Sequence, residues 1–292
     1  MTVQAKLAVS LLLLGLSASA WSAKKVDLDY HVKLLPQSDQ AQVRLSLSQG
    51  SAVRSLNFDL GRDGDYSDFK ADGQWQVTPE AGASRGLWRP SADKASLTYR
   101  VRLSHARKAG IYESRMTPGW ALFRGEDLVP AARLDQQDGV ELVSRLTIEL
   151  PAGWKSVETP WPRIGKHKFR IDNVSRLFDR PTGWMLAGSL GSRRVRLGET
   201  EITVTSPKGQ AMRRMDVLTL LTFVWPQVQA AFPRHPAKLL VVGASDPMRR
   251  GVFSERDSIY LNSRTPLVSE NGSSPLIREV VQAIGRFNDH QG

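Results

Sequence analysis

Alternation of apolar and polar residues over the first two-thirds of the chain constrains its fold more than any other feature. In the segment VDLDYHVKLL (26–35) apolar residues alternate with polar ones as far as Val32, and AQVRLSLSQ (41–49), SLTYRVRLS (96–104), VSRLTIELP (143–151) and ETEITVTSP (199–207) repeat the pattern. A period of two places one face of each strand in a core and the other in water. Turns rich in glycine and proline separate these segments, so residues 21–206 are predicted to form an antiparallel β-sandwich domain.

The pattern changes near Ser206-Pro207. Apolar residues follow at helical spacing between 210 and 232, where Pro226 is expected to kink or split the helix. AKLLVVGAS (237–245) is a continuous apolar run typical of a buried strand, and DSIYLN (257–262) is a second strand candidate. A last helix is expected after Ser273-Ser274-Pro275, a helix start signal. The fold class is therefore mainly β with an α/β C-terminal part, residues 207–292.

The first 20 residues have the composition of a signal peptide. Lys6 precedes an apolar run, and Ala18-Ser19-Ala20 matches the small-residue cleavage pattern, so cleavage is expected after Ala20. No later segment is long enough to cross a membrane. The chain has no cysteine, which excludes disulfides and thiolate metal sites. Export without disulfides favours the bacterial periplasm, or secretion, as its location.

The formal net charge of the whole sequence is +11. Such a basic protein is attracted to polyanions, but its Arg and Lys residues are scattered along the chain rather than gathered in one run. Export argues against a nucleic-acid partner. Weak binding to anionic envelope surfaces is the remaining expectation from charge alone.

The last helix contains the pentapeptide Arg278-Glu279-Val280-Val281-Gln282. In a zinc-peptidase helix, histidines at i and i+4 bind the metal and a Glu at i+1 is the general base. Here Arg278 and Gln282 occupy the two ligand positions, and neither a guanidinium nor an amide is a good zinc ligand. Glu279 keeps the position of the base, but beside Arg278 it is more simply expected to form a surface ion pair.

Several longer stretches resemble the gluzincin metallopeptidases of the glycyl-aminopeptidase and aminopeptidase N type. These stretches are RLTIELPAGWKSVETPW (145–161), FRIDNVSRLFDRPTGWMLAG (169–188) and the segment from Phe232 to Val268 that precedes SSPLIREVVQAIG (273–285). The resemblance implies a β-sandwich followed by an incomplete thermolysin-like α+β domain. It also places Glu255 near the glutamate that binds the substrate amine.

Three functions are compatible with these observations. The resemblance combined with the replaced ligands predicts a periplasmic, metallopeptidase-like pseudoenzyme that needs no cofactor and binds a peptide or a periplasmic protein. A second reading is a diverged or truncated copy of an active zinc-dependent aminopeptidase or endopeptidase, with zinc as cofactor only if the family function survives. A third is a basic β-sandwich module that binds envelope polyanions.

Overall fold

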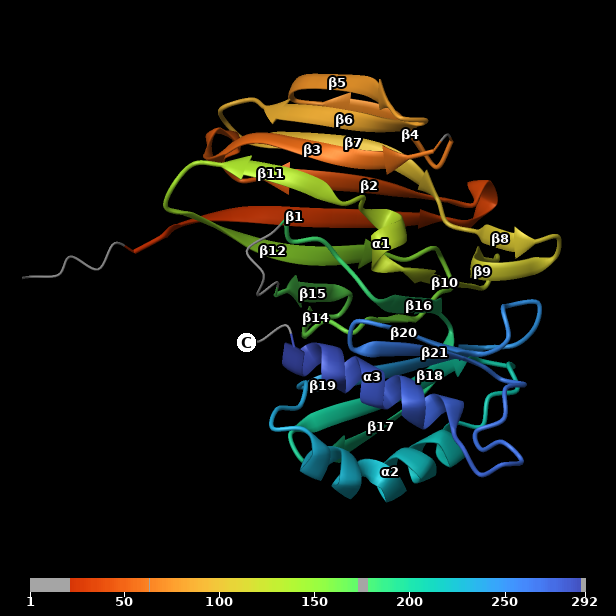
Figure 1. Ribbon diagram of the computed structural model, residues 1–292. Helices are drawn as coiled ribbons and strands as arrows, with labels where there is room; N and C mark the ends of the chain where they lie inside the picture. Colours follow the sequence, from red (N-terminus) through yellow and green to blue (C-terminus); the bar gives the residue numbers. More distant parts are fainter. Residues whose placement is uncertain (1–21, 63, 173–177, 290–292) are drawn as a thin grey trace, which may run out of the picture.

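A computed structural model describes residues 22–62, 64–172 and 178–289, and it shows a mainly β protein with two long helices near the C-terminus (Figure 1). The residues expected to form the signal peptide lie outside the described residues. Within the described part of the chain, no helix is both long and apolar enough to span a bilayer.

The first region, from Lys24 to Gly188, contains three sheets. The largest has seven strands in the order β14 (Arg163–Gly165), β15 (Lys168–Ile171), β12 (Val140–Glu149), β1 (Lys24–Leu35), β2 (Gln40–Leu47), β7 (Ala95–Arg102) and β4 (Tyr66–Ala71). A four-stranded sheet has the order β11 (Ala132–Gln136), β3 (Val53–Gly61), β6 (Ala83–Pro90) and β5 (Gly73–Glu80). A five-stranded sheet has the order β13 (Ser156–Glu158), β16 (Trp184–Gly188), β10 (Trp120–Arg124), β9 (Ile111–Met116) and β8 (His105–Lys108). Short helical turns, η1 (Pro36–Ser38), η2 (Gly50–Ala52) and α1 (Gly125–Leu128), connect some of these strands.

The expected alternation is present in this region. In β1 the residues Leu28, Tyr30 and Val32 are buried while their neighbours face solvent or are half-buried. The buried faces of the three sheets share one hydrophobic core. Not every strand pair is antiparallel as expected, because β1 runs parallel to β12.

The second region is a layered α/β unit. Its sheet has the order β17 (Leu190–Leu197), β18 (Thr200–Pro207), β19 (Lys238–Ala244), β21 (Ser258–Asn262) and β20 (Val252–Glu255), with β18, β19 and β21 parallel. Both helices, α2 (Arg214–Ala231) and α3 (Pro275–Asp289), pack into one core with residues of this sheet such as Val204, Val241 and Ile259. The neighbouring residues on the other face, among them Leu240 and Val242, pack with Leu122 and Leu186 of the five-stranded sheet. The second sheet thus lies between two helices and the first region.

Two details differ from the sequence-based expectation. The segment 199–207, assigned to the first domain, forms β18, and both β18 and β17 belong to the second sheet. Alternation shows that a strand has a buried face but not which sheet contains it. Helix α2 is also not split, because it runs through Pro226 from Arg214 to Ala231.

Candidate functional site

A cavity of about 230 Å³ lies where the first region meets the second. Its walls come from β9, β10 and β16 of the first region and from β20, β21, α3 and the segment before β20 of the second. The lining residues are Glu113, Arg124, Trp184, Arg249, Phe253, Ser254, Glu255, Tyr260, Glu279, Gln282 and Arg286. We refer to this cavity as the groove.

Three aromatic side chains form an apolar part of the groove. The rings of Trp184 and Tyr260 lie 5.2 Å apart, and Phe253 stacks parallel to Tyr260 at 6.2 Å. The polar atoms of two of these rings are satisfied within the protein, because the Trp184 indole donates to the Phe253 carbonyl at 3.0 Å and the Tyr260 hydroxyl donates to the Arg249 carbonyl at 2.5 Å. Trp184 and Tyr260 are buried, and the Arg249 guanidinium lies 3.5 Å from the centre of the half-buried Phe253 ring, so Phe253 is the ring that already holds a cation.

Charged side chains of both signs surround the aromatic rings. Glu113 forms an ion pair with Arg249, in which the carboxylate oxygen and the guanidinium nitrogen are 3.4 Å apart. Glu255 forms a similar pair with Arg124 at 3.5 Å, and about a third of each of the four side chains is exposed. These distances exceed those of tight charge-assisted hydrogen bonds, and exposed pairs of this kind contribute little stability. A ligand carrying its own charged groups can therefore compete for these side chains.

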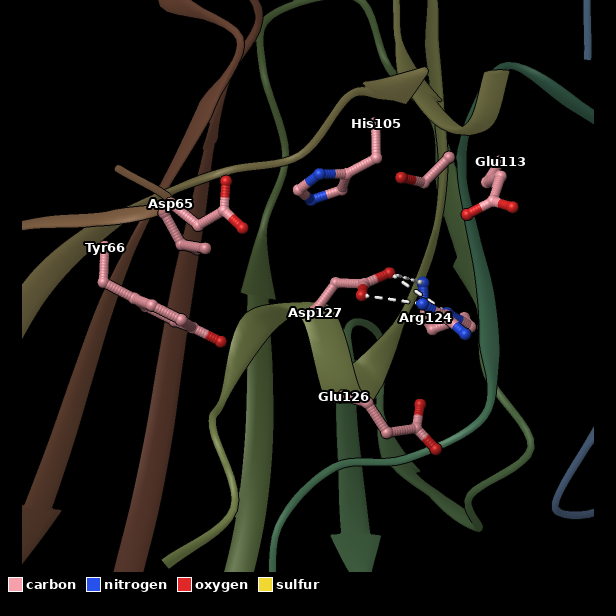
Figure 2. A pocket seen from close by; sticks show the side chains of 9 residues that line it. Asp65, Tyr66, His105, Glu113, Arg124, Glu126 and Asp127 are labelled. Atoms are coloured by element: carbon pink, nitrogen blue, oxygen red, sulfur yellow. Dashed lines mark hydrogen bonds and ion pairs between the residues drawn. The ribbon is translucent and has the colours of Figure 1, made fainter. Parts of the chain in front are cut away.

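Arg124 also faces a second, adjacent cavity of about 270 Å³, which shares Glu113 with the groove. Figure 2 shows the ion pair between Arg124 and Asp127, in which the guanidinium nitrogen and the carboxylate oxygen are 3.2 Å apart. Glu126 lies nearby. Burial raises the pKa of Glu126, and the negative charge of Glu255 raises it further, whereas backbone N–H donors, including that of Gly183, oppose the shift. The junction of the two cavities is thus rich in carboxylates, and Arg124 is the cation between them.

On the opposite wall, three side chains form a hydrogen-bonded chain. Ser254 on β20 donates to the Glu279 carboxylate on α3 at 2.7 Å, and Arg286 on α3 donates to the Ser254 oxygen at 2.8 Å. Residues 279 and 286 are seven apart, two helical turns, and so lie on one face of α3. This chain connects the edge strand of the second sheet to its last helix.

The structure brings three of the four residues singled out in the sequence into the groove. Glu255, Glu279 and Gln282 line it, whereas Arg278 is exposed and is not among the lining residues. The expected surface ion pair between Glu279 and Arg278 is wrong, because Glu279 accepts its hydrogen bond from Ser254 instead. Arg278 lies one turn before Gln282 on α3, and local spacing alone could not show that only the latter reaches the groove.

Sequence reasoning missed four charged residues of the groove: Glu113, Arg124, Arg249 and Arg286. Arg286 lies on the same helix as Glu279, seven residues later, and this spacing was the one sequence signal that could have placed it beside Glu279. The others come from β9, β10 and the segment before β20, far apart in sequence, and no local pattern marked them.

The residues at the zinc-helix positions do not fit zinc. The groove presents a carboxamide, Gln282, and a carboxylate, Glu279, that is already hydrogen-bonded, and the next side chain on that face is the cation Arg286. Zinc in proteins is held by imidazole, thiolate and carboxylate groups, and a guanidinium repels it. Among the described residues, no cluster of three or more His, Asp or Glu side chains is placed to bind a metal ion.

The sequence matches no protein-family model and no curated protein. The structure is similar to that of an aminopeptidase N family protein from Idiomarina loihiensis, with a TM-score of 0.61 and 16% identity, over 84% of this chain and 45% of that one. It is also similar to a two-domain M1 zinc metallopeptidase bound to L-tryptophan, with a TM-score of 0.50 and 13% identity, over 90% of this chain and 64% of that one.

The fold of this chain is similar to part of the fold of these two proteins. This confirms the resemblance to gluzincins at the level of architecture. The chain spans less than two-thirds of the length of either protein, and at such low identity the likeness concerns the fold alone.

Proposed function

We propose that this chain is an exported, peptidase-like protein that binds the amino-terminal end of a peptide in the groove and does not hydrolyse it in this form. The observation that carries the proposal is the composition of the groove: Glu255 and Glu279 are present, but Gln282 occupies a position where zinc would need a ligand, and the cation Arg286 lies one turn further along the same helix. The proposed location rests on the leader-like composition of residues 1–20.

Binding has a physical basis in the groove. A protonated peptide amine can replace Arg124 as the partner of Glu255, because that ion pair is long and partly solvated. The first side chain of the peptide would lie against the half-buried ring of Phe253, in place of the Arg249 guanidinium. In addition, β20 is the last strand of the second sheet, so an extended peptide can pair with its outer edge.

Calorimetric titration with short peptides tests the binding. A tripeptide with a free amine should bind, and its N-acetylated form should bind at least about tenfold more weakly, since one charged hydrogen bond is lost. Glu255→Gln should remove most of this difference between the two peptides. Glu141→Gln, an exposed carboxylate on β12, is the matched control and should keep it.

Metal analysis of the purified protein tests the absence of hydrolysis. We expect no stoichiometric zinc and no chelator-sensitive release of amino acids from peptides. Stoichiometric zinc together with peptidase activity would instead favour the diverged aminopeptidase and refute the proposal.

A further inference from the structure

The outward side of α2 is apolar although it faces solvent. Met215 is 58% exposed and Phe223 is 76% exposed, the latter being the most exposed large apolar side chain of the described residues. Thr219, Thr222, Pro226 and Ala230 are exposed between them, and the polar residues Asp216, Gln227 and Gln229 border this side. No charged residue occurs from 217 to 231. An apolar side of a helix is normally covered by protein or lipid. Only one side of α2 is covered, by the second sheet.

The two threonines make this side less polar than their side chains suggest. The hydroxyl of Thr219 donates to the Met215 carbonyl at 2.8 Å, and that of Thr222 donates to the Leu218 carbonyl at 2.7 Å. Both hydroxyl protons are therefore satisfied within the helix and need no water. Methyl groups, a phenyl ring and a proline ring thus form the middle of the outer surface, between Gln229 on one side and Asp216 and Gln227 on the other.

Cations gather at the amino end of this helix. The helix starts at Arg214 with Arg213 just before it, and Lys208 lies in the turn that follows β18. The Arg214 guanidinium packs against Gly191 on β17 and donates to Ser206 at 2.9 Å. Arg193, two residues after Gly191, is exposed on the same side of β17. Asp216 neutralises part of this charge through its pair with Arg213 at 3.4 Å. The helix dipole adds to the remaining positive charge at this end.

We propose that the α2 face, defined by Met215, Thr219, Thr222, Phe223 and Pro226, docks on an anionic lipid surface. An exposed apolar helix face beside a cluster of cations has the combination that amphipathic interfacial helices use, with apolar groups at the acyl boundary and cations at the phosphates. Helix α2 lies at the end of the molecule opposite β5 and β6, so it can lie flat on a surface while the groove stays accessible (Figure 1). The proposal is independent of peptide binding.

Co-sedimentation of the full chain with vesicles tests it. Binding to vesicles that contain phosphatidylglycerol should exceed binding to pure phosphatidylcholine vesicles and should fall as salt is raised, because salt screens the attraction. Phe223→Ser should lower the partition onto anionic vesicles about tenfold, since one aromatic side chain leaves the apolar phase. Val77→Ser, an exposed apolar residue 48% accessible on β5, is the matched control and should leave the partition unchanged.

The charges are tested in the same way. Arg193→Gln and Lys208→Gln should each lower the partition about fivefold at low salt, whereas Arg89→Gln, exposed on β6 at the far end, should not. All variants carry the same residues 1–21, so any contribution of that segment cancels. Two results would overturn the proposal: equal binding of the Phe223 and Val77 variants, or a concentration-dependent dimer that Phe223→Ser abolishes, which would assign the face to a second copy of the chain.

Discussion

The two regions of the molecule bury their strands in different ways. Strands of the first region, such as β1, alternate between buried and accessible residues, because one face of the sheet meets solvent. In the second region β19 buries every residue from Leu239 to Ala244. Its sheet is covered by α2 and α3 on one face and by β10 and β16 of the first region on the other.

This difference shows that the second region does not complete its own core. Leu240, Val242 and Tyr260 would be exposed without Leu122, Trp184 and Leu186. The groove lies at the edge of this shared interface, so its shape depends on both regions. The comparison therefore predicts that the interface, rather than either separate core, couples folding to ligand binding.

The largest effect is expected at Trp184, which belongs to the shared interface and is 5% exposed. Trp184→Ala should lower the free energy of unfolding by about 3–5 kcal/mol, because it leaves a cavity and an unpaired Phe253 carbonyl. Hydrogen exchange should become faster in both β10 and β19. Faster exchange in one region alone would show that the regions fold independently.

An intermediate effect is expected at Leu276, which is fully buried on α3 in the core of the second region. Leu276→Ala should cost about 2–4 kcal/mol through the cavity it leaves. Denaturant unfolding followed by hydrogen exchange should show the loss mainly in α3 and the second sheet. Val281→Ala, 40% exposed on the same helix, is the control, and a similar cost there would contradict the assigned helix face.

The smallest effect concerns Glu126, which lies where the regions meet. Because its pKa is raised by burial, the folded state binds its proton more tightly than the unfolded state. Its contribution to stability is full below its ordinary pKa of 4.5 and is lost as the pH rises through the higher folded value. Glu126→Gln keeps an acceptor for the Gly183 N–H and should gain stability relative to the parent protein over that interval.

Thermal melts at a series of pH values measure this gain. Glu141→Gln removes an exposed carboxylate of the same charge and serves as the control. If the Glu126 variant followed the parent protein at every pH, the carboxyl would not be desolvated at the interface.

Much of the architecture could be predicted from local pattern. Alternation in segments such as 26–32 and 96–103 identified strands and their buried faces, which the structure confirms. The start signal Ser273-Ser274-Pro275 identified α3, which begins at Pro275. In contrast, local pattern did not reveal that α2 leaves Phe223 exposed, because an apolar residue at a helical position is normally assigned to a core.

The candidate site was only partly predictable, for a different reason. Glu279 and Gln282 were found because a known helix motif fixes their spacing, and Glu255 because of the family resemblance. Arg124, Arg249 and Glu113 approach them across the interface from three separate segments. Sequence spacing carries no information about such contacts.

The sequence by itself determined the strands, the helices and the loss of imidazole at positions 278 and 282, because each depends on residue type and on the local period of the backbone. The tertiary structure alone decided that β17 and β18 join the second sheet, that Glu279 binds Ser254 rather than Arg278, and that three arginines and three glutamates line one groove. The physical reason is that a buried face is a local property, whereas the surface that covers it is chosen by packing between distant segments.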